Sequence, residues 1–347
     1  MQTITLAMSV DDIIGKVQNA VWGWPLIILI LAAGVWLTVR TGFVQVLHLG
    51  KALKFMVKNE DNGEGEVTSF GALCTALSAT IGTGNIVGVA TAICLGGPGA
   101  LLWMLLAAFF GMATKYSEGF LAIKYREKKD DSHYLGGPFY YIEKGMGVKW
   151  KWLAKIFAFF GACVGLMGIG TFSQVNGIAS AVTGFFDPNK TNTITLFGND
   201  YSIVTVISAF VLAILAGLVI IGGLKRISSV SQVVVPFMAI LYVLTVVVLI
   251  ICNITKLPAA IAEVVTSAFG AKAMAGGALG AVLISMKNGI ARGIFSNEAG
   301  LGTGSIAHAC AGACKTGTYL HDRHIYRHDH YLHNDRSCYR NGRFMEG

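Results

Sequence analysis

Apolar stretches about 20 residues long follow one another along most of this 347-residue chain, and they constrain its fold more than any other feature. About seven can be delimited, at 21–39, 70–95, 100–123, 152–185, 203–223, 233–252 and 274–309. Apolar residues make up 54% of the chain and charged residues 13%, about half the charged share of a soluble domain. Because helices satisfy their own backbone in lipid, we expect an all-α polytopic membrane protein with no soluble domain between the spans.

Basic residues occupy alternate loops between these stretches. The basic loops hold Arg40, Lys51, Lys54 and Lys58, then eight lysines and arginines between 124 and 155, then Lys225 and Arg226, whereas the other loops hold Lys190, Lys256 and Lys272. Cytoplasmic loops carry the excess of Lys and Arg, so we predict a multi-pass protein of a bacterial-type plasma membrane with its N-terminus outside. Topology accounts for the net charge of +8 without a nucleic-acid partner.

Residues 78–92 form an interrupted membrane span. They contain the glycines Gly82, Gly84 and Gly88, and their polar side chains include Thr80, Thr83 and Asn85. Each glycine weakens a helix by about 1 kcal/mol, and non-helical backbone at membrane depth is tolerated where it lines a cavity. A midplane binding site is one interpretation, in which freed carbonyls suit a sodium ion and freed amides suit a carboxylate. Close helix packing through Gly84 and Gly88 is the other.

Two further stretches carry polar groups inside spans. Gln174 shares a helical face with Thr171 and Ile178, so it either enters a common cavity or bonds a neighbouring helix. Residues 275–309 are broken by glycines and hold Gly280, Ser285, Lys287, Asn288, Arg292 and Glu298. Charges inside a span cost about 2.5–3.5 kcal/mol unless they pair, which makes them functional candidates.

The charged candidates have structural interpretations as well. We expect Arg292 and Glu298 to pair at the cytoplasmic end as a gate or staple. Glu118 is expected to brace the broken spans by accepting their free amides.

Residues 133–146 form either an amphipathic or re-entrant segment, or a plain turn followed by a surface helix.

Enzymatic function has no support in the spans. No phosphate-binding loop and no catalytic triad or metalloprotease spacing occurs there, so ATP-driven pumping is not expected either.

Three motifs occur in order: SATIGTGNIVGVA at 78–90, LGGPFYYI at 135–142 and RGIFSNEAGLG at 292–302. Together they resemble the alanine/glycine:cation symporter family, and the resemblance covers about residues 15–309. It implies a LeuT-type inverted-repeat fold with an added leading helix at 21–39 and a first core span at 70–95. It also implies import of alanine or glycine with sodium, or with protons in some members.

The resemblance carries roles to particular residues. It implies substrate contacts for Thr83, Gly84 and Gln174, and places the sixth core span at 275–309, where Gly280, Ser285 and Asn288 are further candidates. Thr80, Gly82 and Asn85 are the expected sodium site, and Glu118, Arg292 and Glu298 the gating or structural charges. No resident metal is predicted. Alanine versus glycine, sodium versus proton and the oligomeric state stay open.

Residues 310–347 do not fit a membrane span. They hold Cys310, Cys314 and clustered histidines among Asp, Arg, Asn and Tyr. A metal-binding tail and a solvated basic tail are two interpretations. The favoured one is a frameshift, because dropping the first base of His, Asp, Asn and Tyr codons yields Ile, Met or Thr. On that hypothesis the chain is truncated after about the sixth core span and does not transport. A channel subunit and a metal-binding membrane sensor are the alternative functions.

Overall fold

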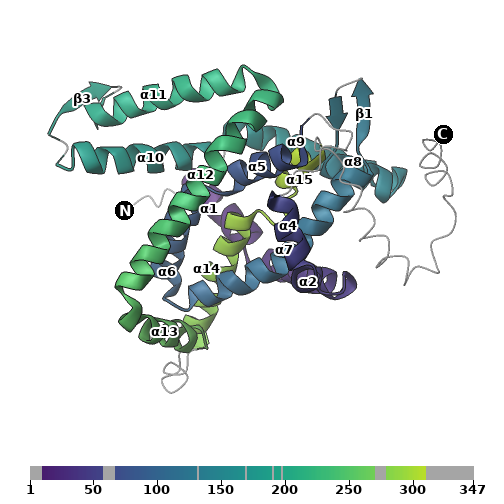
Figure 1. The fold of residues 1–347 in the computed structure, drawn as a ribbon, viewed down its shortest axis with the longest axis horizontal. Helices are drawn as coiled ribbons and strands as arrows, with labels where there is room; N and C mark the ends of the chain where they lie inside the picture. The colour runs from purple at the N-terminus through teal and green to yellow at the C-terminus, as the bar shows by residue number, and fades with distance from the viewer. Residues whose placement is uncertain are drawn as a thin grey trace, which may run out of the picture.

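The computed structural model describes residues 10–57, 67–130, 133–168, 170–189, 191–196, 198–269 and 279–309. These residues are mostly helical, and their strands form two small antiparallel hairpins (Figure 1). One hairpin pairs β1 (Glu127–Asp130) with β2 (His133–Leu135), and the other pairs β3 (Thr193–Leu196) with β4 (Asn199–Ser202). The predicted all-α polytopic class is confirmed. The predicted tail at 310–347 lies outside the described residues.

Five described segments are long and apolar enough to cross a membrane: Ile14–Arg40, Ala100–Lys124, Val148–Phe186, Ile203–Ile220 and Gly223–Cys252. A sixth arises if the bent pair Phe70–Thr80 and Thr83–Gly96 is one span. Six of the seven predicted stretches correspond to these segments. In the seventh, the described part is α14 (Leu279–Asn297) and α15 (Thr303–Ala309), and the polar side chains of α14 keep it out of this set.

The leading span consists of α1 (Val10–Val21) and α2 (Trp24–Arg40). Pro25 sits in the first turn of α2, where its missing N–H leaves no helical hydrogen bond unmade. After α2, Gly42 (φ 65°) and Phe43 (φ 56°) turn the chain sharply into α3 (Val44–Leu47) and α4 (Leu49–Val57).

The long stretch predicted at 152–185 is interrupted by glycines. Helix α9 (Lys151–Met167) ends at Gly168 (φ 60°), and α10 (Thr171–Phe186) begins after Gly170 (φ 93°). Both glycines adopt positive φ angles that other residues reach only at a cost. The two helices together form the larger part of the 39-residue candidate span.

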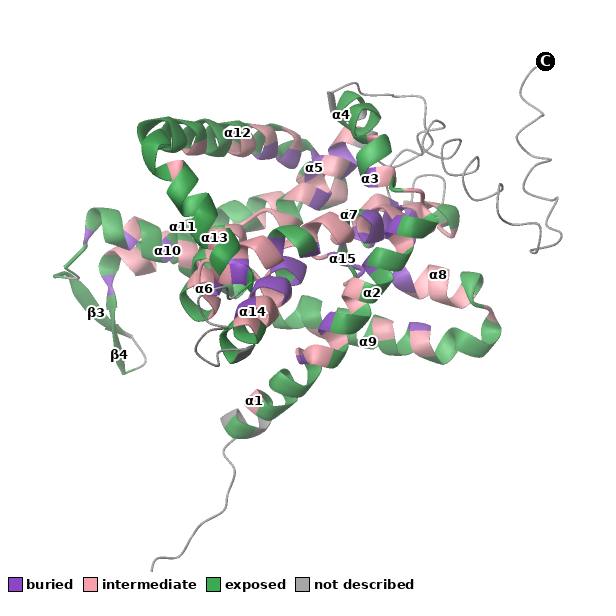
Figure 2. Cartoon of the chain, turned by 90° about the horizontal axis from the view of Figure 1, so that it is seen from below, coloured by how far each residue is buried: buried purple, intermediate pink, exposed green. Residues whose placement is uncertain are grey.

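Helices α11 (Ile203–Ile220) and α12 (Gly223–Cys252) form a hairpin on the outside of the molecule. Figure 2 shows both helices largely exposed along their length. Their surfaces are rich in Val, Ile, Leu and Phe, and Ile221 between them is 86% exposed. Apolar helices with so little burial match a lipid environment. The short helices η3 (Ile254–Lys256) and α13 (Leu257–Phe269) follow.

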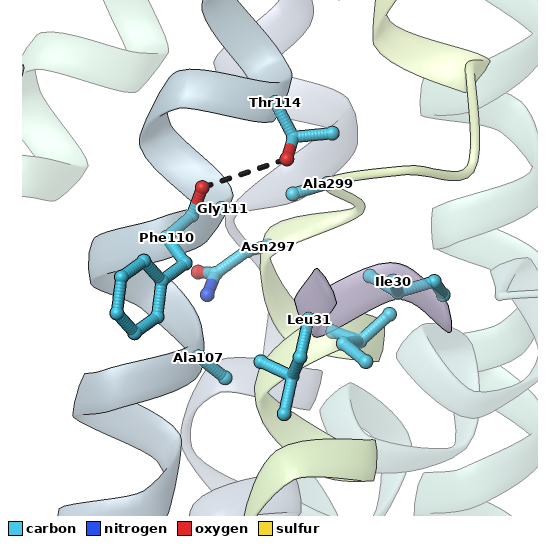
Figure 3. A pocket seen from close by; sticks show the side chains of 9 residues that line it. Ile30, Leu31, Ala107, Phe110, Gly111, Thr114, Asn297 and Ala299 are labelled. Atoms are coloured by element: carbon cyan, nitrogen blue, oxygen red, sulfur yellow. Dashed lines mark hydrogen bonds between the residues drawn. The ribbon is translucent and has the colours of Figure 1, made fainter. Parts of the chain in front are cut away.

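Helix α7 (Ala100–Lys124) lies at the centre, packed against α2, α6 (Val87–Gly96), α14 and α15. Small residues let these helices approach closely: a methyl group on Gly34 would lie 3.1 Å from Phe110 Cβ, and one on Gly293 would lie 3.2 Å from Ala107 Cβ. Figure 3 shows the small pocket between α2, α7 and α14, lined by Ile30, Leu31, Ala107, Phe110, Gly111, Thr114, Ile294, Asn297 and Ala299.

The segment at 133–146 contains a turn followed by a short helix, and both of its predicted alternatives allow this. Strand β2 is followed by a turn at Gly136 and Gly137 and then by the short helix α8 (Pro138–Gly145). Helix α8 packs against α9 after the turn η2 (Val148–Trp150).

Candidate substrate and ion site

The span predicted to be interrupted is broken in the structure. Helix α5 (Ser69–Thr80) ends at Ile81, the turn η1 (Thr83–Asn85) follows, and α6 continues at an angle of 61° to α5. Ile81 (φ −93°, ψ 112°) and Gly82 (φ −156°, ψ −162°) are extended. The two residues therefore separate two helical segments within one stretch of apolar sequence.

The break leaves backbone groups without helical partners. Asn85 N–H donates to Gly82 O (3.0 Å) and Ile86 N–H donates to Thr83 O (3.1 Å), which closes only the turn itself. Within the described chain, none of the backbone hydrogen bonds outside the helices uses the carbonyls of Ala79, Thr80 and Ile81 or the amides of Gly82, Thr83 and Gly84. The end of α5 thus offers oxygen ligands and the start of η1 offers N–H donors.

Gln174 of α10 lies directly against this break. A methyl group on Gly82 would overlap its side-chain amide, so Gly82 allows the close approach. One turn further along α10, a methyl group on Gly177 would lie 3.0 Å from Thr83 Cγ2. Gln174 therefore lies beside the broken span, and its two interpretations, entry into a common cavity and a bond to a neighbouring helix, both stay predictions.

Asn85 receives a hydrogen bond from α14. Ser296 Oγ donates to Asn85 Oδ1 over 2.7 Å, between residues 211 positions apart. Sequence reasoning did not single out Ser296, although it lies in the third motif beside Asn297. The signal that could have identified Ser296 was a hydroxyl group within a motif that also contains several glycines.

The other residues predicted at the break have different surroundings. Thr80 Oγ1 donates to Ala76 O of its own helix (2.9 Å). A methyl group on Gly84 or on Gly88 would have no atom within 4 Å, so close packing does not explain these glycines. Open space beside Gly84 is consistent with a binding site there.

Three predicted substrate residues lie elsewhere. Helix α14 runs antiparallel to α6, so Ser285 and Asn288 lie near Gly96, at the end of α6 that is far from the break. A methyl group on Gly96 would lie 3.2 Å from Ser285 Cα. Asn288 Nδ2 donates to Ile284 O of its own helix (3.0 Å), and the buried Ser285 hydroxyl has no partner among the described atoms. Gly280 opens α14 with open space around it. The structure does not bring these residues to Gly82, and their substrate role stays a prediction.

The expected Arg292–Glu298 pair is not among the ion pairs of the described residues. Glu298 instead accepts from Thr303 Oγ1 (2.7 Å), because a positive φ of 52° turns the chain away from the axis of α14. Glu118 on α7 is buried, and its Oε1 accepts from Gly300 N–H (3.0 Å). Glu118 therefore accepts one backbone amide just after α14, and its bracing of the broken spans stays a prediction.

The second and third motifs pack on each other. A methyl group on Gly136 would lie 2.6 Å from Ala309 Cβ, and one on Gly302 would lie 2.5 Å from Pro138 Cγ. Arg126 Nη1 donates to Ala309 O (3.1 Å) at the end of α15. Burial raises the pKa of Tyr141 in α8 to about 12, with the charge of Glu118 acting in the same direction and a hydrogen bond with Ser305 opposing it. Tyr141 is therefore a neutral phenol beside α15.

Across the described ranges, no group of three His, Cys, Asp or Glu residues is placed to hold a metal ion. The cysteines and histidines of the predicted metal-binding tail lie outside those ranges.

The geometry defines a multi-pass helical membrane protein with one broken span, which α10 and α14 contact at the break. The family model for the sodium:alanine symporter family matches residues 7–317. The chain is 49% identical over 305 residues to an uncharacterized transporter of Haemophilus influenzae, covering 88% of this chain and 63% of the relative.

Two further relatives carry names that describe alanine carriers. The sodium/alanine symporter AgcS of Methanococcus maripaludis is 43% identical over 309 residues, covering 88% of this chain and 64% of AgcS. The putative sodium/proton-dependent alanine carrier protein YrbD of Bacillus subtilis is 39% identical over 300 residues, covering 86% and 57%. This chain belongs to the sodium:alanine symporter family. It spans less than two thirds of the length of these relatives.

Proposed function

We propose that the protein binds a small amino acid, alanine or glycine, together with sodium at the break between α5 and α6, as part of a secondary active importer. The observation that carries the proposal is that the break is contacted by two other helices, with Gln174 of α10 at Gly82 and Ser296 of α14 at Asn85. Membership of a family of sodium-coupled symporters supports the same assignment.

The chemistry of the site supplies both ligands. The substrate carboxylate would meet the free amides at the start of η1, and the open space beside Gly84 suits a small side chain. Sodium would be held by the carbonyls at the end of α5 and by Asn85 Oδ1, which carry no net charge. One positive charge moving inward down 100 mV gains about 2.3 kcal/mol, which can drive accumulation.

We propose a LeuT-type arrangement for the whole protein. In it, α2 is the added leading helix, α5 and α6 form the first core span, α9 and α10 the third, and α14 the sixth. The basic loops then lie in the cytoplasm and the N-terminus outside. Broken helices meeting at a repeat interface are the expected site in such a fold.

The test is equilibrium binding of labelled alanine and glycine to the purified full chain in detergent, titrated with sodium chloride against choline chloride. We expect binding that requires sodium, and about tenfold weaker binding for Asn85→Ala and for Gln174→Ala. Thr91→Ala is the matched control, since Thr91 Oγ1 donates only to Val87 O of its own helix, beyond the break (2.7 Å). Equal binding in choline chloride would contradict sodium coupling.

Transport is read separately, in proteoliposomes with an imposed sodium gradient. Accumulation above the outside concentration would exclude a channel, which cannot concentrate its substrate. A proton gradient without sodium distinguishes proton coupling. If residues 310–347 are read out of frame, we expect no accumulation by this chain.

A further inference from the structure

The segment 298–302, which joins α14 to α15 and is called the joint below, has an unusual backbone. Three of its five residues have positive φ angles: Glu298 (52°), Gly300 (91°) and Gly302 (76°). Its internal hydrogen bonding is sparse, with Leu301 N–H donating to Glu298 O at 3.4 Å. A segment of this kind keeps one conformation only if surrounding groups hold it.

Helix α7 supplies two such groups from one face. Lys115 Nζ donates to Glu298 O (3.2 Å), and Glu118 Oε1 accepts from Gly300 N–H (3.0 Å). Residues three apart on a helix are neighbours, so the ammonium meets a carbonyl and the carboxylate meets an amide of the same joint. Hydrogen bonds with one charged partner are stronger than neutral ones. Neither charge is paired with another side chain across the joint among the described ion pairs.

Both charges lie in a candidate membrane span, where each is costly. Glu118 is 9% exposed. A methyl group on Gly304 would lie 2.7 Å from Lys115 Nζ, so α15 also fits closely over this face of α7. The contacts that Lys115 and Glu118 make with the joint offset part of this cost.

Helix α15 is the element that the joint positions. It contacts both α7 and α5, the helix that leads into the break. Pro138 of the second motif lies against Gly302, and Arg126 holds the last carbonyl of α15. The predicted topology places these contacts on the cytoplasmic side, beside the basic loops.

We propose that Lys115 and Glu118 form a two-point clamp that fixes the α14–α15 joint to α7, so that α15 closes the cytoplasmic side of the broken span while the clamp is made. They are positioning residues, since neither touches Gly82 or Asn85. The closing role rests on the proposed transport function. The clamp itself does not.

The test is amide hydrogen exchange, followed by mass spectrometry, on the purified full chain in detergent without sodium or alanine. We expect Glu118→Ala and Lys115→Met each to speed exchange in peptides covering 298–309 by about tenfold, with α7 residues 101–112 unchanged. Glu118→Gln keeps an acceptor oxygen and should fall between Glu118→Ala and the unaltered chain. It also remains informative if the alanine variant does not fold.

Ser117→Ala is the matched control, because Ser117 lies between the two residues and its hydroxyl donates to Ala113 O of its own helix (2.9 Å). The double variant should exchange no more than about twofold faster than the faster single variant, since both contacts hold one joint. Unchanged exchange at 298–309 in both single variants would overturn the clamp, as would an equal rise throughout α7. These outcomes are independent of alanine binding, so failure of the clamp and failure of the proposed function are distinguishable.

Discussion

At the residue scale, the site depends on glycines and amides whose partners are distant in sequence. Gly82 leaves room for the Gln174 amide, and Asn85 receives the Ser296 hydroxyl. The sequence identified Gly82, Asn85 and Gln174 because polar groups and glycines stand out in apolar spans. It did not identify Ser296, because serine is common on helix surfaces and its partner lies 211 positions away.

Replacing Gly82 tests this contact directly. In Gly82→Ala the new methyl group would displace the flexible Gln174 amide, with little loss of stability. We expect alanine binding to weaken by about tenfold and the apparent unfolding temperature in detergent to fall by less than about 4 °C. Gly165→Ala in α9, where no atom lies within 4 Å of the new methyl, is the control. Unchanged binding would show that Gln174 does not act through Gly82.

At the element scale, the connections between helices are more constrained than the helices themselves. The joint after α14 and the turn before α8 fit against each other through Gly302, Pro138 and Gly136. The sequence recorded these residues as motifs but could not show that the second and third motifs pack together. Their contact is a tertiary one, because it requires α7 and α15 to lie side by side.

Gly302→Ala should destabilise the fold. Its φ of 76° disfavours a side chain, and the methyl group would lie 2.5 Å from Pro138 Cγ and 3.1 Å from Phe157 Cζ. We expect a loss of about 2–4 kcal/mol, measured as a lower unfolding temperature in detergent. Gly161→Ala, in the interior of α9 with open space around it, should be neutral or stabilising. Equal unfolding temperatures for the two variants would contradict this packing.

Asp187 gives the β3–β4 hairpin a dependence on pH. Its Oδ2 accepts from Ser202 Oγ (2.8 Å) and its Oδ1 from Thr191 N–H (2.9 Å). These hydrogen bonds, Ser202 first, hold the pKa of Asp187 below its usual 3.8. A lowered folded-state pKa means that the stabilisation is full above about 3.8 and disappears as pH falls through the folded value.

Limited pepsin digestion from pH 5 downward measures this effect when the chain is compared with Asp187→Asn at each pH. We expect the unaltered hairpin to be cut more slowly than the variant at about pH 4–5, with the difference vanishing at lower pH. Asp200→Asn is the control, since Asp200 accepts from exposed Thr195 in the same hairpin. If the difference in cutting rate persisted at the lowest pH, the effect would come from the shape of the Asp187 side chain and not from its charge.

At the scale of the whole molecule, α7 organises the described chain. It contacts the leading helix α2, the second half of the broken span, and the helices α14 and α15. Small residues on α7, α2 and α14 make this possible, whereas α11 and α12 stay apolar and exposed. Hydropathy alone could separate spans from loops, but it could not show which spans pack at the centre of the molecule and which stay exposed.

The tail hypothesis belongs to this scale. The family match ends at residue 317, and residues 319–335 are rich in His, Asp, Asn and Tyr. If these residues are read out of frame, another frame of the coding DNA beyond codon 317 should encode further apolar spans resembling the family. Sequencing that DNA and translating all three frames measures this. Three frames without an apolar span would refute the hypothesis and revive the metal-binding tail, which zinc titration of a 305–347 peptide would then test.

The sequence by itself determined the membrane class, six of the spans, the place where one of them breaks and the family motifs. These properties follow from local composition, since hydropathy, glycine content and polar residues act within one stretch of chain. The tertiary structure decided which helices meet. It placed Gln174 and Ser296 at the break and left Ser285 and Asn288 at the other end of α6. It also gave Glu298 a partner other than Arg292, because a positive φ redirects the backbone in a way that no spacing rule records.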